Sequence, residues 1–351
     1  MEWEGAVAKP KVLVTGGAGF IGSNLVHSLL SDGYDVTVFD NLSRKGSRIN
    51  AAWLASLHGK AFRLVQGDVR DFRAVAEAAR DVDRIYHFAA QVAVTTSVTD
   101  PREDFEVNAQ GTFNVLEAAR TVADHPVMLF TSTNKVYGGM EDVAISELPT
   151  RHMYRDFPDG MDESRPLDFH SPYGCSKGAA DQYVRDYYRI YGIPTTVFRM
   201  SCIYGTRQFG VEDQGWVAHF VISAVKGRPI TIYGDGKQVR DILFADDLIR
   251  AMRLAPERLD KTAGQVFNIG GGAANTLSVW VEFKEILGRL AGKPVEAAAW
   301  RTWRPGDQLV YVSKCAKAKA AFGLEPQVSK EEGITRLWNW VRDNLELFDN
   351  A

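Results

Sequence analysis

The amino-acid sequence predicts an α/β protein, in which a doubly wound parallel sheet is followed by a smaller α/β C-terminal domain. Three observations support this prediction. Short β-branched runs alternate with longer amphipathic stretches through the first 200 residues or so. A glycine-rich turn follows the first of these runs. Beyond about residue 200 the alternation becomes irregular, and glycine, proline and tryptophan become more prominent.

The elements can be assigned in chain order from this alternation. Apolar β-branched runs predict strands, and the amphipathic stretches between them predict helices. The expected strands are Lys11–Thr15, Asp35–Phe39, Ala61–Val65, Arg84–Phe88, Val127–Thr131 and Thr195–Arg199. The expected helices include Ser23–Leu30, Val107–Thr121 and Tyr173–Tyr191. Residues 230–241 and 264–272 are expected to form loops and short strands.

Composition excludes several classes of protein. The 351 residues are 45% hydrophobic and 24% charged, with a formal net charge of −3 and no basic run of five, so nucleic-acid binding is not expected. No apolar stretch approaches the roughly 18 residues that cross a bilayer, and the first ten residues lack the order of a signal peptide. The three cysteines form no CxxC motif, so we expect no metal site, no disulfide framework and a cytoplasmic protein (Cys175, Cys202 and Cys315).

The glycine-rich turn indicates a dinucleotide site. It reads Thr-Gly-Gly-Ala-Gly-Phe-Ile-Gly from Thr15 to Gly22, and it lies between an expected strand and an expected helix. Glycines let the backbone approach a pyrophosphate, and the helix N-terminus presents free N–H groups to that anion. Asp40 ends the second strand 18 residues beyond Gly22, where a carboxylate binds the adenosine ribose and disfavours a 2′-phosphate. NAD is therefore favoured over NADP, although Arg44 lies nearby and weakens that preference. The alternative is a tight strand–helix turn without a ligand.

These assignments suggest two domains. We expect a flexible extension at residues 1–10, an NAD-binding domain at 11–199 with part of 230–270, and a substrate-binding domain at 200–345.

A second pattern indicates proton transfer. Tyr173 and Lys177 lie four residues apart, on one face of an expected helix. A nearby ammonium and an oxidised nicotinamide would stabilise the phenolate, so the tyrosine could accept a hydroxyl proton. Thr133 lies at the carboxyl end of an expected parallel strand, where ligands bind. The alternatives are a solvated helix face for the first pair, and strand propensity or capping for the threonine.

Four motifs, in this order and spacing, resemble the extended short-chain dehydrogenases/reductases of the NAD-dependent epimerase/dehydratase family, which act on nucleotide sugars. They are TGGAGFIG (15–22), VNAQGT (107–112), TSTNKVYG (131–138) and YGCSK (173–177), and the resemblance extends from Lys11 to about Trp340. It implies a Rossmann-type fold and catalysis by Thr133, Tyr173 and Lys177. It also implies that NAD is bound by Gly16, Gly19, Phe20, Ile21, Gly22, Asp40, Asn41, Ser43, Arg44, Asp68, Val69, Ala89, Ala90, Gln91, Asn108, Tyr173 and Lys177.

The two residues after Thr133 favour epimerisation over dehydration. Sugar 4,6-dehydratases of this family carry an aspartate and a glutamate there, which serve as the acid and base of water elimination. This chain has Asn134 and Lys135, and neither supplies that carboxyl pair. Oxidation of a hydroxyl-bearing carbon followed by re-reduction needs no such pair.

Longer segments are similar to the family's 2-epimerases that interconvert CDP-paratose and CDP-tyvelose, among them residues 40–46, 167–183 and 236–241. Because these sugars lack a hydroxyl at C3, the expected route is hydride transfer from C2 to NAD and return on the opposite face. Arginines that can fork onto a diphosphate suit such a substrate. The expected substrate-binding residues are Asn134, Lys135, Ser201, Arg240, Arg304 and Asp307; a surface ion pair is the alternative for either arginine.

Other readings stay open. The substrate could be a UDP- or GDP-linked hexose, epimerised at C2 or C4, and an inactive NAD-sensing or scaffold protein is the alternative outside the enzymes. The helices around Asn108 and Tyr173 are expected to be long, amphipathic and exposed, and the family resemblance implies that such helices pair across a two-fold axis, so a homodimer or homotetramer is expected.

Overall fold

A large parallel sheet organises the N-terminal part of the chain. The computed structural model describes residues 9–44, 46–304 and 306–349. Seven strands pair in the order β12-β8-β5-β4-β1-β2-β3, and every neighbouring pair is parallel. The order reverses on either side of β1, so the sheet is doubly wound and the predicted fold class is confirmed. The strands are β1 (Lys11–Thr15), β2 (Asp35–Asp40), β3 (Phe62–Gln66), β4 (Arg84–His87), β5 (Val127–Thr133), β8 (Thr195–Met200) and β12 (Gln265–Ile269).

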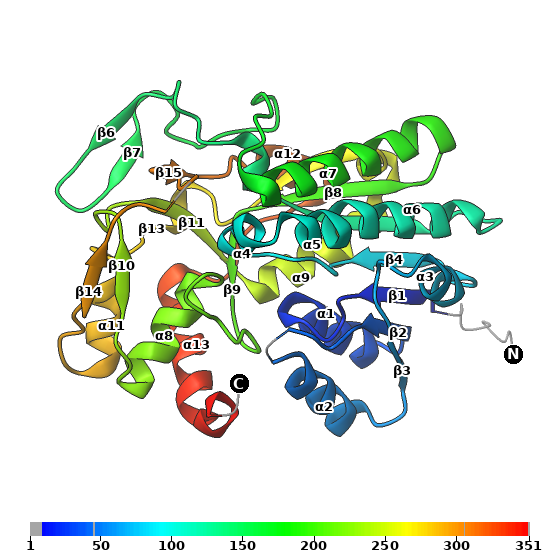
Figure 1. Ribbon diagram of the computed structural model, residues 1–351, viewed down its shortest axis with the longest axis horizontal. Helices are drawn as coiled ribbons and strands as arrows, with labels where there is room; N and C mark the ends of the chain where they lie inside the picture. The colour runs from blue at the N-terminus through cyan, green and yellow to red at the C-terminus, as the bar shows by residue number, and fades with distance from the viewer. Residues whose placement is uncertain (1–8, 45, 305, 350–351) are drawn as a thin grey trace, which may run out of the picture.

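Helices cover both faces of this sheet (Figure 1). Side chains alternate along β1, so Val12 and Val14 pack into the core on one face and Leu13 packs into the core on the other. The helices of the first face are α1 (Phe20–Ser31), α9 (Ala245–Leu254) and α12 (Ala316–Phe322). The helices of the second face are α3 (Phe72–Ala79), α6 (Gly111–Thr121) and α7 (Ser171–Tyr191). Helix α2 (Ser47–His58) packs beside α1.

The C-terminal part has its own small sheets and core. Strands β13 (Thr276–Ser278), β11 (Val239–Phe244) and β15 (Val310–Tyr311) are joined by β9 (Cys202–Tyr204), and β10 (Thr231–Tyr233) pairs with β14 (Ala299–Arg301). Helices α8 (Trp216–Lys226), α11 (Phe283–Ala291) and α13 (Lys330–Asp343) supply most of this apolar core. The remaining elements are short: α4 (Val94–Thr99), α5 (Pro101–Phe105), η1 (Glu106–Gln110), η2 (Asn134–Tyr137), β6 (Ile145–Glu147), β7 (His152–Tyr154), η3 (Ala255–Arg258), α10 (Leu259–Thr262), η4 (Ala273–Asn275) and η5 (Leu345–Phe348).

One local expectation needed adjustment. The helix expected over 107–121 contains the π-helical turn η1, and α6 begins only at Gly111. Residues 264–272 contain β12, which returns to the large sheet and pairs with β8. The predicted domain limits themselves stay a prediction, and residues 1–8 of the expected extension lie outside the described residues. Among the described residues, no helix is long and apolar enough to span a membrane.

A buried ion pair holds α7 against the sheet. The guanidinium of Arg199 in β8 donates two hydrogen bonds to the carboxylate of Asp181 in α7, at 2.8 and 2.9 Å. Both side chains are almost fully buried. Arg199 also donates to the hydroxyl of Tyr137, which itself donates to Asn268 of β12 at 2.7 Å. The pair therefore ties the helix that carries Tyr173 to two strands.

Replacing one partner of this pair should destabilise the fold. We expect Asp181→Asn to lower the free energy of unfolding by about 3 kcal/mol or more, because the buried guanidinium loses its counter-charge. Urea unfolding followed by circular dichroism measures this. Asp186→Asn, an exposed carboxylate on the same helix, is the matched control. Equal stability of the two variants would contradict the assignment.

Candidate active site

The glycine-rich turn forms a tight connection between β1 and α1. Gly16 has a φ of +69°, and a Cβ there would lie 2.6 Å from the backbone nitrogen of Ala89. A Cβ on Gly22 would collide with the carbonyl oxygen of Gly16. Helix α1 begins at Phe20 after Gly19, with no side chain capping its first N–H groups. The turn thus leaves a helix N-terminus available to an anion, as a pyrophosphate site requires.

Asp40 lies at the end of β2, beside this turn. Its carboxylate accepts hydrogen bonds from the backbone N–H of Ala18 at 3.0 Å and of Leu42 at 2.8 Å. Burial raises the pKa of this carboxyl, while the backbone hydrogen bonds act in the opposite direction. Each oxygen keeps a lone pair, so the expected contact with a ribose is compatible with this geometry and stays a prediction.

The next group of predicted cofactor residues forms a polar cluster. Asn41 donates to Asp68 at 3.0 Å, and Ser43 donates to Asn41 through its N–H and its hydroxyl. Arg70, which the sequence reasoning missed, donates twice to Asp68 and lowers the pKa of that carboxyl to about 2. Val69 is buried.

Arg44 is placed differently from these residues. It donates to Gln214 of the C-terminal part at 3.0 Å and thereby connects the two parts of the chain.

A buried polar network lies under the start of α7. Asn108 accepts a hydrogen bond from the N–H of Gln91 and donates to the hydroxyl of Ser176. Asp104 accepts from Gln91 at 3.1 Å, from Asn108 at 3.1 Å and from Ser176 at 2.5 Å, and it is fully buried. Asn108 and Asp104 thus both bond Ser176 of α7, the helix that carries Tyr173. The sequence reasoning missed Asp104. Ala89 and Ala90 lie beside this network, partly buried after β4.

The three predicted catalytic residues come together at the carboxyl edge of the sheet. Thr133 ends β5, and its hydroxyl is close enough to the phenol of Tyr173 to lower the pKa of that group. Burial outweighs this and raises the pKa of Tyr173 to about 12. Burial also lowers the pKa of Lys177 to about 7, and its ammonium lies 4.2 Å from the centre of the Phe130 ring. The protein alone does not provide the lowered tyrosine pKa that proton acceptance needs.

Several predicted substrate residues lie together around the loop of Arg304 to Gln308. Arg240 donates to Asp307 at 2.7 Å, and it is 6% exposed. The ammonium of Lys135 donates to the carbonyl oxygen of Gly306 at 3.1 Å, and burial lowers the pKa of this lysine to about 8. Arg304 lies 4.0 Å from the centre of the Tyr233 ring. Three cationic side chains thus lie near one loop, but both arginines are ion-paired within the protein, Arg240 with Asp307 and Arg304 with Asp213 at 3.4 Å. Their expected contacts with a diphosphate stay predictions.

The other two predicted substrate residues are engaged with the protein. Ser201 donates to the backbone oxygen and the carboxylate of Asp241. Asn134 donates to Gln308, a residue that the sequence reasoning did not single out, at 3.2 Å. Their expected sugar contacts stay predictions.

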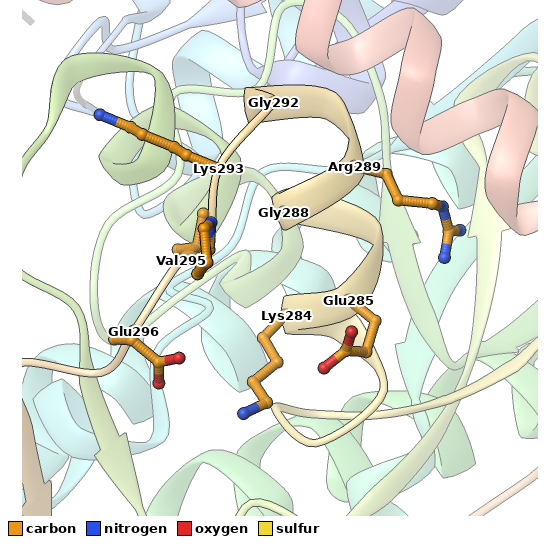
Figure 2. A pocket seen from close by; sticks show the side chains of 9 residues that line it. Lys284, Glu285, Gly288, Arg289, Gly292, Lys293, Val295 and Glu296 are labelled. Carbon is orange, nitrogen blue, oxygen red and sulfur yellow. The ribbon is translucent and has the colours of Figure 1, made fainter.

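A surface hollow of about 570 Å³ lies elsewhere, beside α11. Figure 2 shows that Lys284, Glu285, Arg289 and Lys293 surround it without converging on one point. None of the predicted site residues lines this hollow. Among the described residues, no group of three or more histidine, cysteine, aspartate or glutamate side chains could hold a metal ion.

The fold and the site define a member of the NAD dependent epimerase/dehydratase family, and the chain belongs to it: the family's model matches residues 12–270. The predicted family is therefore confirmed. The chain is 46% identical over 344 residues to the CDP-paratose 2-epimerase of Salmonella typhi, a match that covers 94% of this chain and 99% of that protein.

Relatives of lower identity are named for other reactions on nucleotide sugars. A putative UDP-glucose 4-epimerase of Methanocaldococcus jannaschii is 32% identical, and the match covers 95% of this chain and 99% of that protein. The structure of a dTDP-glucose 4,6-dehydratase from Streptomyces venezuelae, solved with NAD bound, superimposes with a TM-score of 0.83 at 32% identity. That match covers 97% of this chain and 99% of the other.

The crowding at Gly16 can be tested separately from its backbone conformation. Gly16→Ala and Gly33→Ala both place alanine at a positive φ, which costs about 1–2 kcal/mol. Nothing lies within 4 Å of a Cβ at Gly33, whereas Gly16 meets the backbone of Ala89. We expect Gly16→Ala to lose about 1–3 kcal/mol more in the free energy of unfolding without cofactor. If urea unfolding gave the same loss of unfolding free energy for both variants, the turn would accommodate a Cβ at Gly16 without a steric clash.

Proposed function

We propose that this protein is a nucleotide-sugar 2-epimerase that interconverts CDP-paratose and CDP-tyvelose with bound NAD. The observation that carries the proposal is the 46% identity, over nearly both full lengths, to the CDP-paratose 2-epimerase. The site agrees with it, because Asn134 and Lys135 follow Thr133 where a dehydratase would need a carboxyl pair.

The cofactor would be held along the carboxyl edge of the large sheet. The first turn of α1 would hold the pyrophosphate, Asp40 and the Asn41–Asp68 pair would hold the adenosine end, and Lys177 would hold the nicotinamide ribose. When bound, NAD accepts a hydride from the sugar and returns it. Its oxidised ring also carries the positive charge that lowers the pKa of Tyr173 toward the working range.

The side chains of this protein transfer the proton of the C2 hydroxyl. Tyr173 takes the proton of the C2 hydroxyl at its phenolic oxygen, and Thr133 donates a hydrogen bond to the same sugar oxygen as negative charge develops on it. Arg240 and Arg304 hold the diphosphate while the 2-keto sugar turns its other face toward the nicotinamide. Tyr173 finally returns its proton, which gives the inverted alcohol.

Conversion of CDP-paratose in heavy water tests this proposal. We expect proton NMR to show CDP-tyvelose without deuterium at C2, with no cofactor added, because the same hydride leaves and returns. Tyr173→Phe should slow conversion at least ~100-fold, whereas Tyr188→Phe, on the exposed side of the same helix, should not.

Other outcomes would redirect the proposal. Conversion of a UDP- or GDP-linked hexose alone would favour the 4-epimerase reading, for which the M. jannaschii relative is a precedent. Deuterium at C2 would contradict direct hydride return. If no nucleotide sugar were turned over, an NAD-sensing protein would be the remaining alternative.

All three cysteines are free, which supports a reducing cytoplasm as the place of action.

We also propose that copies of this chain pair through α6 and α7, as a dimer or as a tetramer built from two such dimers. These helices pack against each other and expose Phe113 and Tyr183, whose ring centres are 5.8 Å apart. Ile190, further along α7, is 64% exposed. An apolar surface of this kind favours a partner surface.

Light scattering at micromolar concentration should therefore return twice or four times the chain mass. Tyr183→Glu should shift the mass toward that of a single chain, because it places a charge in the interface. A single-chain mass for the unchanged protein would rule the association out.

A further inference from the structure

The loop around Gln308 is attached directly to the turn that follows Thr133. This turn is η2, and it ends at Gly138. The ammonium of Lys135 donates to Gly306, and the side chain of Gln308 bonds both Asn134 and Gly138. Gln308 is 1% exposed and is separated from Asn134 by 174 residues of sequence.

The direction of each hydrogen bond in this arrangement is fixed. A backbone carbonyl only accepts, so the bond of 2.6 Å to the Gly138 oxygen must come from the amide nitrogen of Gln308. The amide oxygen of Gln308 therefore faces Asn134 and accepts from its nitrogen at 3.2 Å. This leaves the amide oxygen of Asn134, and not its nitrogen, facing the hydroxyl of Thr133.

Thr133 is constrained from its other side as well. The backbone N–H of Lys135 donates to the Thr133 hydroxyl at 3.2 Å, so one lone pair is occupied and the proton must point elsewhere. The amide oxygen of Asn134 lies 3.4 Å away, which is long for a hydrogen bond between oxygens. Asn134 therefore holds this proton only weakly. The proton is free to turn toward the side of Tyr173, whose phenol lies within hydrogen-bonding reach of Thr133 and where the sugar oxygen would bind.

We propose that Gln308 is a positioning residue: it holds the Asn134 amide back, so that the proton of Thr133 stays available to the reacting sugar oxygen. This rests on the proposed function, in which Thr133 hydrogen-bonds that oxygen. Without Gln308, the amide oxygen of Asn134 can approach to the usual ~2.8 Å and compete with the sugar for the proton. Gln308 itself touches neither the sugar nor the cofactor in this scheme.

Kinetics separate this role from a general loss of stability. Gln308→Leu should lower kcat about tenfold, the effect of one hydrogen bond made in the transition state, with KM changed less than twofold. The deuterium isotope effect at C2 should rise, because hydride transfer becomes slower relative to the other steps. Thr262→Val is the matched control: it removes a buried hydroxyl bonded to Ala255 at 2.9 Å, in a helix that precedes β12. The control should keep kcat. A rise in KM with unchanged kcat for Gln308→Leu would overturn the proposal.

A second background makes the test specific to Asn134. If Gln308 acts by restraining the Asn134 amide, Gln308→Leu should have no further effect on kcat in an Asn134→Ala protein. An equal tenfold loss in that background would show that Gln308 acts by another route.

A titration without sugar tests the same idea independently of the substrate. Without sugar, the Thr133 hydroxyl is placed to donate to the Tyr173 phenolate, since its contact lowers the pKa of that phenol. Capture of the Thr133 proton by Asn134 should therefore raise the pKa of Tyr173 by up to about one unit in the NAD-loaded Gln308→Leu protein. Tyrosinate absorbance, measured as the difference from the matching Tyr173→Phe protein, gives this pKa. The charged groups near the phenol, Asp104 and Arg44, are the same in both proteins.

The two readouts keep the two proposals apart. A shifted titration with no conversion of CDP-paratose would reject the proposed substrate and support the role of Gln308. Conversion of CDP-paratose with an unchanged titration and unchanged kcat in Gln308→Leu would reject the role of Gln308 alone.

Discussion

The site depends on where the parallel strands of the large sheet end. Their carboxyl ends lie along one edge, so the glycine-rich turn after β1, Asp40 at the end of β2 and Thr133 at the end of β5 all lie at the same edge. The ion pair of Arg199 with Asp181 holds α7, the helix that carries Tyr173, against β8 of this sheet. A charge buried so fully is costly unless its partner is in place. The position of Tyr173 relative to Thr133 is therefore set by the fold rather than by the ligand.

Features that depend on short spacings were predictable from the sequence. The turn from Thr15 to Gly22 and the pair of Tyr173 and Lys177 are each encoded within a few residues, so pattern and periodicity were enough to place them. Thr133 followed from the strand that precedes it, although β5 runs two residues further than the pattern indicated.

Features that depend on distant pairs were not predictable in the same way. Gln308 meets Asn134 across 174 residues, and Asp104 meets Ser176 across 72, and neither partner carries a local signal. Strand β12 is one of the short strands expected within residues 264–272, but its pairing with β8, which is distant in sequence, has no local signal. The pKa values of Tyr173 and Lys177 depend on burial, which a helix pattern does not describe. The sequence indicated the chemical groups of the site, whereas their environment required the fold.

The return of β12 to the large sheet determines when this sheet can finish folding during synthesis of the chain. β12 forms an edge of the sheet beside β8, and α9 and α12 cover the face of the sheet that α1 begins to cover. Leu248 and Phe322 belong to the same apolar core as Val12 and Val14. Because Val12 and Val14 lie roughly 230 or more residues earlier in the chain, they leave the ribosome long before these partners. The first half of the nascent chain must therefore keep an apolar face uncovered for most of translation. Folding of the dinucleotide-binding half is completed only when nearly the whole protein has been synthesised.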